Sequence, residues 1–200
     1  MNAALGYLAR NAAELNIEPD AIVLAGDSAG AQIASLVALI TTDPSYARQM
    51  GISPSLKPER LAAILLLSGG FDIESVDLEG DFGWFLKTVL WAYSGTRDFM
   101  NDDRFRLISV THYVTSAFPP AFISSGNGDP LTPQAMALAR KLEALGVTVD
   151  SLFFPADYTP PLPHEYQFNL DIPAGQEALE RTLAFIGVIV QPKQDNYQPP

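Results

Sequence analysis

Short apolar runs alternate with helical patterns along most of the chain. Each run has the length of a strand and is bounded by glycine, proline or polar residues, a pattern that favours strands over buried helices. The first two runs are apolar throughout, so we expect them to be buried on both faces of a sheet. The four predicted strands are residues 21–25, 61–67, 121–125 and 147–154.

Helical patterns separate these runs. In the first of them, Leu5, Leu8 and Leu15 belong to a series of apolar residues that recurs every three or four positions. Strands that alternate with helices predict a mostly parallel sheet with both faces covered, which is an α/β three-layer sandwich. The predicted helices are residues 5–15, 31–43, 133–145 and 175–190.

One segment departs from this alternation. Residues 71–113 hold no clear strand and are rich in aromatic side chains, and they lie between the second and third strands, where an insertion would cover the carboxyl ends of the strands. The last ten residues, 191–200, are polar and rich in proline and glutamine, which predicts a flexible tail. We therefore expect a single α/β domain over residues 1–190, with an insertion at about 71–113.

Composition and charge narrow the possible functions. The chain carries a formal net charge of -11, whereas nucleic acids and anionic lipids require a basic surface. It has no cysteine and two histidines, so we expect no disulfide, no metal site and no cofactor. No run reaches the roughly 18 apolar residues of a membrane span. Residues 1–10 have the pattern of an amphipathic helix rather than of a signal peptide, which favours a cytoplasmic location.

Residues 26–30 have the sequence GDSAG, which directly follows a predicted strand and directly precedes a predicted helix. A strand, a tight turn and a helix in this order expose the central residue, Ser28, as a nucleophile. We expect close backbone contacts to require both Gly26 and Gly30. The backbone N–H of Ala29 would point at an oxyanion, assisted by the helix dipole. The alternative is a serine that only caps an ordinary helix.

A serine nucleophile needs a base, and the chain offers His112 and His164. Proteins built on such a turn carry the nucleophile first, then the acid, then the histidine. His164 lies late in the chain, in a proline-rich loop before the last helix, so we predict that it is the base. A solvated loop histidine is the alternative. His112 precedes the third strand and is predicted to be structural or exposed.

The acid should follow the third strand. Asp129 lies there in a glycine-containing loop, and its role would be to orient the imidazole of His164 and to stabilise its charged form. The alternative for Asp129 is an ordinary Asp-Pro turn. Asp157 is the second candidate acid, but it is close in sequence to the histidine loop.

These motifs together resemble one family. GDSAG at residues 26–30, DPL at residues 129–131 and the late His164-Glu165 pair are similar to those of the hormone-sensitive-lipase-like esterases of the α/β-hydrolase superfamily. The segments FPPAFI at residues 118–123 and LEALGV at residues 142–147 add to the resemblance, which extends from about residue 3 to residue 187.

The resemblance implies an α/β-hydrolase fold and hydrolysis of small-molecule carboxylic esters through an acyl-serine intermediate. It assigns the catalytic roles to Ser28, Asp129 and His164, and the oxyanion hole to Ala29. It also implies that the aromatic insertion is part of a cap over the acyl pocket. Ordinary packing of aromatic side chains is the alternative reading of that insertion. The candidate pocket walls are Phe82, Trp84, Phe85 and Trp91.

The chain departs from the family pattern before the nucleophile. Family members carry a His-Gly-Gly motif upstream of the serine, and its N–H groups complete the oxyanion hole, but this sequence contains no such motif. We therefore expect a domain that is incomplete at its N-terminal side, and an upstream targeting signal would be lost with that part. Removing one oxyanion donor typically slows turnover by about 10²–10³, so we expect weak activity.

The same departure would leave the first strand at an edge of the sheet. Unpaired backbone groups between Ala21 and Ala25 would then favour pairing with a second copy of the chain. Two other functions stay open. The missing motif fits a non-catalytic remnant that acts as a binding or interaction module, and an amide or peptide hydrolase would use the same residues.

Overall fold

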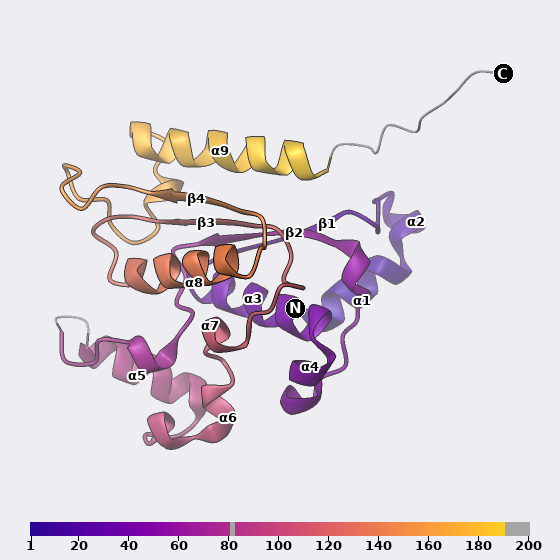
Figure 1. Ribbon diagram of the computed structural model, residues 1–200, viewed down its shortest axis with the longest axis horizontal. Coiled ribbons are helices and arrows are strands. Elements are labelled where there is room, and N and C mark those ends of the chain that lie inside the picture. The colour runs from indigo at the N-terminus through magenta and orange to yellow at the C-terminus, as the bar shows by residue number, and fades with distance from the viewer. Residues whose placement is uncertain (81–82, 191–200) are drawn as a thin grey trace.

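A parallel sheet lies between two layers of helices in the computed structural model, which describes residues 1–80 and 83–190 (Figure 1). The strand order is β1-β2-β3-β4, so sequential strands are neighbours. This arrangement confirms the predicted α/β three-layer sandwich. The strands are β1 (Ile22–Asp27), β2 (Leu61–Leu67), β3 (Ala121–Ser125) and β4 (Val149–Phe153), close to the predicted ranges.

Helices cover both faces of the sheet. On one face α9 (Pro173–Ile189) packs against β2 and β3, and on the other α3 (Ala29–Thr42) and α8 (Thr132–Ala144) pack against the four strands (Figure 1). Gly146 follows α8 with a φ of +78°, the conformation in which a glycine ends a helix at no steric cost. All three helices confirm predicted ones.

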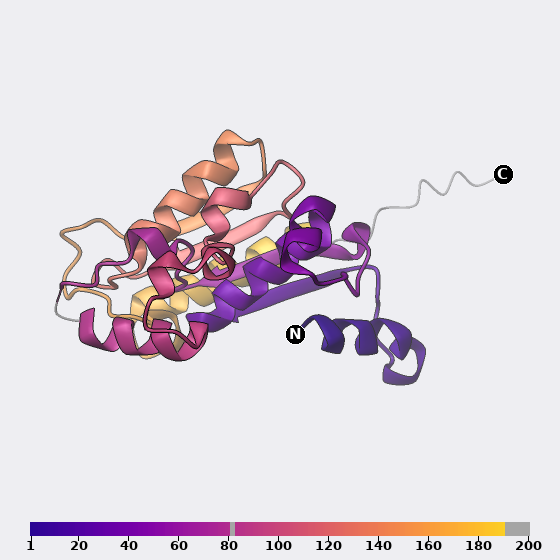
Figure 2. The same cartoon turned by 90° about the horizontal axis from the view of Figure 1, so that it is seen from below.

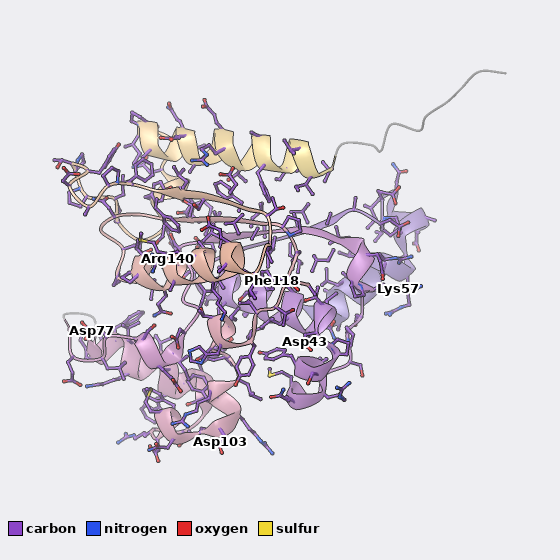
Figure 3. All side chains as sticks on the ribbon, viewed as in Figure 1. Asp43, Lys57, Asp77, Asp103, Phe118 and Arg140 are labelled. Carbon is purple, nitrogen blue, oxygen red and sulfur yellow. The ribbon has the colours of Figure 1, made fainter. Side chains whose placement is uncertain are left out.

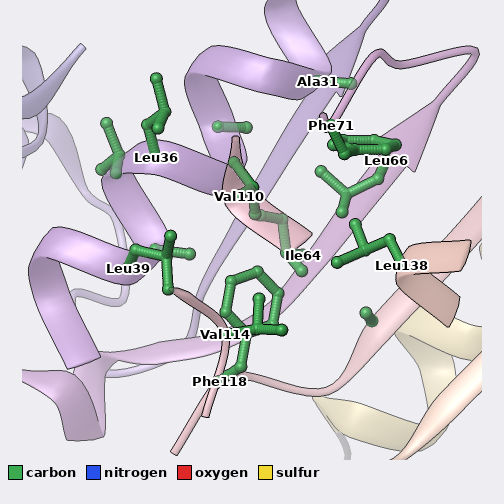
Figure 4. Packing of buried hydrophobic residues seen from close by; sticks show 14 of the residues in the cluster. Ala31, Leu36, Leu39, Ile64, Leu66, Phe71, Val110, Val114, Phe118 and Leu138 are labelled. Atoms are coloured by element: carbon green, nitrogen blue, oxygen red, sulfur yellow. The ribbon is translucent and has the colours of Figure 1, made fainter. Parts of the chain in front are cut away.

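The central strand β2 has a hydrophobic core on each side. Ile64 and Leu66 face α3 and α8, where they pack with Phe71 (Figure 4). Ala63 and Leu65 belong to the second core, beneath α9. Because alternate residues of β2 are buried on opposite faces, every position is apolar, and the strand reads as a continuous hydrophobic run.

The first strand lies at an edge, as predicted, and it is less buried than its sequence suggests. In the described part of the chain β1 pairs with β2 alone. Leu24 is buried toward α3, but Ala25 on the opposite face is exposed. The expectation that residues 21–25 are buried on both faces is therefore wrong. The reason is that α9 packs mainly against β2 and β3, so that on its side of the sheet Val23 is only partly buried and Ala25 is exposed.

Two helical features differ from the predictions. The first predicted helix is divided into α1 (Asn2–Arg10) and α2 (Ala12–Leu15), because Asn11 leaves the helical conformation. A short helix that we did not predict, α4 (Pro44–Met50), begins after Asp43 (Figure 3). The Asp43 carboxylate accepts hydrogen bonds from two backbone N–H groups of its first turn. An aspartate followed by proline is the sequence signal for such a start.

The insertion at residues 71–113 is helical where the structure describes it. It contains α5 (Gly83–Ser94), α6 (Asp103–Arg106) and α7 (Val110–Tyr113). α5 lies at the opposite end of the molecule from α1 (Figures 1 and 2). The extent of the domain and of its cap stays a prediction, and the predicted tail at residues 191–200 lies outside the described residues. Short 3-10 turns complete the chain: Pro58–Arg60, Ile73–Ser75, Phe99–Asn101 and Tyr166–Phe168.

Candidate active site

Ser28 occupies a strained turn between β1 and α3. Its φ and ψ are 54° and -121°, a region that costs a residue other than glycine about 1–3 kcal/mol. The surrounding backbone holds this conformation, because the Ser28 N–H donates to the carbonyl of Leu67 at 2.9 Å and the Ser28 carbonyl accepts from Ala31 N–H at 3.1 Å. The side chain is therefore fixed at the carboxyl end of the sheet rather than free to cap α3.

The two glycines that flank Ser28 differ in what they allow. A Cβ on Gly26 would lie 2.2 Å from the carbonyl oxygen of Gly30, so the tight turn requires a glycine at that position. A Cβ on Gly30 would meet nothing within 4 Å in the described part of the structure. The expectation that both glycines are required is thus wrong for Gly30, whose Cα faces open space at the start of α3.

His164 joins the other two predicted catalytic residues. Its Nε2 lies 2.9 Å from the Oγ of Ser28, and its Nδ1 lies 2.8 Å from Oδ2 of Asp129. The three side chains come from three loops that follow β1, β3 and β4, and all three loops meet at the carboxyl edge of the sheet. A serine, a histidine and a carboxylate joined in this order have the geometry of a nucleophile, its base and the group that orients the base.

Asp129 is fixed more firmly than a turn aspartate needs to be. It is 4% exposed, and its carboxylate accepts hydrogen bonds from Ser125 Oγ at 3.1 Å and from Leu131 N–H at 2.8 Å in addition to the imidazole. The second candidate acid, Asp157, is exposed, and the hydrogen bonds of the described residues do not join it to His164. The structure therefore brings Asp129, and not Asp157, to the histidine.

The surroundings of His164 favour its charged form. The hydrogen bond to Asp129 raises the pKa of His164 above its ordinary value, partial burial opposes this, and the negative charges of Asp129, Glu165 and Asp27 raise the pKa further. An imidazole in this setting can accept a proton from Ser28 and keep it while a negatively charged intermediate forms.

Two acidic side chains that sequence reasoning did not single out, those of Asp27 and Glu165, lie beside His164. Burial, followed by a hydrogen bond and charge repulsion from Glu165, raises the pKa of Asp27 from 3.8 to about 6. Glu165 Oε1 is also 3.8 Å from Nε2 of His164. The sequence could have indicated these two residues by their position, since Asp27 directly precedes Ser28 and Glu165 directly follows His164.

Ala29 is the first residue of α3, where helix N–H groups lack partners within the helix. Among the described residues, its N–H donates to no other group, and Ala29 lines the cavity in front of Ser28. This N–H is therefore available to an oxyanion formed on Ser28. The predicted role of Ala29 fits this position.

A cavity of about 850 Å³ opens in front of Ser28 and His164. One side of α5 forms much of its wall, which is mainly apolar. Of the predicted wall residues, Phe85 lines the cavity and Phe82 lies outside the described residues. The residues of the described chain that line the cavity and that we did not predict include Ile73, Val76, Leu86, Val89, Leu90, Tyr93, Leu131 and Gln134.

Trp84 and Trp91 do not line this cavity, and their prediction is wrong. Both lie on the other side of α5, where Trp84 is 74% exposed and Trp91 stacks beneath the guanidinium of Arg97 at 4.4 Å. The helical period explains this result. Residues 85, 89 and 93 share one side of the helix and residues 84, 88 and 91 share the opposite side, so aromatic composition alone could not identify the wall.

His112 lies on α7 and pairs with Asp72 at 3.4 Å, as expected for a structural or exposed histidine. Within residues 1–80 and 83–190, no cluster of three or more histidine or acidic side chains is arranged to hold a metal ion. No helix within these residues has the length and hydrophobicity needed to cross a bilayer.

The chain is similar to several known proteins. Residues 1–158 match the model of a family described as alpha/beta hydrolase fold. The chain is 31% identical over 189 residues to carboxylesterase NlhH of Mycobacterium tuberculosis, an alignment that covers 91% of this chain and 55% of that protein. It is also 31% identical over 137 residues to esterase LipQ of the same organism, covering 68% of this chain and 31% of that protein.

The chain thus spans about half the length of carboxylesterase NlhH. Among solved structures, esterase B from Lactobacillus rhamnosis superposes with a TM-score of 0.74 at 23% identity, covering 94% of this chain and 58% of that one. The carboxylesterase EstE1 from a metagenomic library superposes with a TM-score of 0.70 at 20% identity, covering 96% and 62%. At these identities the superpositions support the fold alone.

Proposed function

Because the chain belongs to the α/β-hydrolase fold family, in its hormone-sensitive-lipase-like branch, we propose that it is a serine carboxylesterase acting on small-molecule esters. One observation carries the proposal: His164 links the Oγ of Ser28 to the buried carboxylate of Asp129 through two hydrogen bonds of 2.9 and 2.8 Å. The relatives NlhH and LipQ, a carboxylesterase and an esterase, support the same chemistry.

In the proposed reaction Ser28 Oγ attacks the ester carbonyl carbon while Nε2 of His164 takes the serine proton. Asp129 holds the imidazole through Nδ1–H and stabilises its positive charge. The intermediate then collapses, the C–O bond to the alcohol breaks, and the imidazolium returns the proton to the departing alkoxide. A water molecule, deprotonated by the same imidazole, then attacks the acyl carbon. The bond between that carbon and Ser28 Oγ breaks, the imidazolium returns the proton to Ser28 Oγ, and the carboxylic acid leaves.

The negative charge of the intermediate develops on the former carbonyl oxygen. The N–H of Ala29 and the positive end of the α3 dipole are the groups of this chain that would stabilise it. Because the sequence lacks the His-Gly-Gly motif, we expect turnover about 10²–10³ below that of an enzyme with a complete oxyanion hole. Turnover equal to that of carboxylesterase NlhH, measured in parallel and removed by Ser28→Ala, would contradict this expectation.

The cavity favours uncharged substrates with an apolar group. Its wall includes aliphatic and aromatic side chains of α5, and its volume of about 850 Å³ is within the usual range for small-molecule sites. We propose that the apolar group of the ester lies along α5 while its carbonyl faces Ser28.

Hydrolysis of p-nitrophenyl butyrate and labelling by a fluorophosphonate test the proposal. We expect both with the wild type and neither with Ser28→Ala, whereas Ser116→Ala, at an exposed serine, should behave as the wild type. Absence of labelling in the wild type would favour a non-catalytic binding module. Cleavage of anilides in preference to esters would favour an amide hydrolase.

The edge of β1 carries a separate prediction. Pairing of this edge with a second copy of the chain between Ala21 and Ala25 predicts a concentration-dependent dimer. Light scattering coupled to size-exclusion chromatography tests it, and a monomer at all concentrations would refute it.

A further inference from the structure

Gln167 is a buried amide at the carboxyl edge of the sheet. It is 7% exposed, and both ends of its side chain have partners. Its Nε2 donates to Oδ1 of Asp27, and its Oε1 accepts from Oγ of Ser68 at 3.2 Å. Losing such a partner leaves a desolvated polar group at a cost of about 1–3 kcal/mol, so the amide acts as a fixed bridge between these two residues.

The two residues that Gln167 joins lie at the ends of neighbouring strands. Asp27 is the last residue of β1 and directly precedes Ser28. Ser68 directly follows β2, is fully buried, and has a φ of +48°. A residue other than glycine keeps this conformation only where its surroundings fix it, and here the Ser68 N–H donates to the carbonyl of Ser124 at 2.8 Å. Gln167 is therefore attached to two rigid points of the sheet.

The same serine also holds the backbone beside the catalytic histidine. Ser68 Oγ accepts from the N–H of Glu165 at 3.2 Å, and Glu165 directly follows His164. Glu165 has a φ of +63°, so the loop turns sharply at this residue. One hydroxyl thus links Gln167 to the turn that sets the direction of the His164 side chain.

We propose that Gln167 is a positioning residue that keeps Nε2 of His164 within hydrogen-bond distance of Oγ of Ser28. Its amide joins the residue before the nucleophile to the serine that anchors the turn after the histidine. Gln167 does not line the cavity and touches no reacting atom, so it acts through Asp27 and Ser68. The kinetic consequences rest on the proposed esterase function.

Gln167→Met tests the bridge, because methionine keeps the length of the side chain and removes both hydrogen bonds. A displacement of about 1 Å between reacting groups can cost 10²-fold in rate, so we expect kcat to fall about 10- to 100-fold. KM should stay within about twofold, since the cavity wall is unchanged. The control is Gln176→Met at an exposed glutamine of α9, which should keep kcat within about twofold.

Exchanging the amide of Gln167 with the carboxylate of Asp27 should restore the hydrogen bond between them and the lost kcat. Gln167→Glu alone sets two carboxylates against each other and should lower kcat at least as much as Gln167→Met. Combining it with Asp27→Asn gives an amide and a carboxylate at the same two positions in reversed order. We expect the double variant to recover most of the lost kcat. Recovery would show that the hydrogen bond between these two side chains, rather than the identity of either residue, supports kcat.

The imidazole of His164 gives a readout that does not depend on turnover. In a His112→Gln background the chain has one histidine, so its NMR titration is unambiguous. A loosened loop weakens the bond to Asp129, and we expect Gln167→Met to lower the pKa of His164 toward its ordinary value. If the wild type neither hydrolyses esters nor reacts with the fluorophosphonate, the proposed function fails and this titration alone decides the inference. A Gln167→Met variant with unchanged kcat and an unchanged His164 pKa would overturn it.

Discussion

The two sides of the site are built in opposite ways. On the sheet side, Asp129 and His164 are held by hydrogen bonds between groups in the loops that follow β3 and β4. On the α5 side, Phe85, Val89 and Tyr93 line the cavity while remaining 42–49% exposed. Proton transfer needs atoms at defined distances, which directional bonds between fixed groups provide. Holding an apolar chain needs only apolar area, which a helix surface supplies without directional bonds. Substitutions on the two sides should therefore have different kinetic signatures.

The largest effect should come from Asp129, the carboxylate that we propose orients His164. Asp129→Asn leaves the shape of the loop but removes the acceptor that fixes the tautomer of His164, and in a comparable triad this substitution lowers kcat by about 10⁴. We expect kcat to fall by about 10³–10⁴ in p-nitrophenyl ester assays. Asp157→Asn, at the exposed second candidate, is the control and should stay within about twofold. A large loss of kcat in Asp157→Asn and none in Asp129→Asn would assign the role of the acid to Asp157.

The dependence of the hydrolysis rate on pH adds a test of the contact between His164 and Asp129. The reaction needs a neutral imidazole, and the hydrogen bond to Asp129 raises the pKa of His164, so the rate should rise with pH through a midpoint above 6.5. In the residual activity of Asp129→Asn the midpoint should move down, because the stabilising carboxylate is absent. Identical midpoints for the two proteins would contradict the proposed contact.

The next largest effect concerns the turn that carries Ser28. Gly26→Ala places a Cβ 2.2 Å from the Gly30 carbonyl oxygen, which forces the backbone to move. We expect fluorophosphonate labelling to slow by about 10²-fold and the free energy of unfolding to fall by about 1–3 kcal/mol. Gly30→Ala meets open space within α3 and should stabilise the protein by about 0.5–1 kcal/mol. Equal losses from both variants would show that the contact at Gly26 is not the cause.

On the α5 side we expect a smaller effect, expressed in substrate preference. Val89→Trp narrows the cavity, so the ratio of kcat/KM for the octanoate ester to that for the acetate ester should fall about tenfold. Thr88→Trp adds the same side chain outside this cavity and should leave the ratio unchanged. If Val89→Trp, but not Thr88→Trp, also lost turnover of the acetate ester, α5 would have a role in positioning Ser28 and His164.

The smallest effect should appear in the free energy of unfolding, at Asp27 beside Ser28. Burial and Glu165 raise the folded-state pKa of Asp27 from 3.8 to about 6, so the folded protein loses stability as pH rises through this interval. Asp27→Asn cannot ionise and avoids that loss. The free energy of unfolding of Asp27→Asn should equal that of the wild type below pH 3.8 and exceed it by about 1 kcal/mol at pH 8. This figure is modest because the Asp27 carboxylate is partly exposed and therefore screened by solvent. Urea unfolding at both pH values checks it, and a pH-independent difference would count against the acidic pair.

Sequence reasoning was most accurate where one element carries its own signal. The runs at residues 61–67 and 121–125 coincide with β2 and β3. In β2 the signal is strongest, because a strand buried on both faces is apolar at every position. The walls of the cavity were predicted poorly. Trp84 and Trp91 lie in the same aromatic helix as Phe85, and which of its sides meets the cavity depends on contacts with the rest of the fold.

The sequence by itself determined the turn at Ser28, because a strand, a small-residue turn and a helix are local patterns. The proposed order of nucleophile, acid and base follows from where Ser28, Asp129 and His164 stand along the chain. Only the tertiary structure decided that Asp129 rather than Asp157 meets His164, and that Gln167 reaches Asp27 across the sheet edge. Ser28 lies 136 positions before His164, and Asp129 lies 35 positions before it. Contacts over such separations follow from how the strands pair and where their loops converge, which no local pattern encodes.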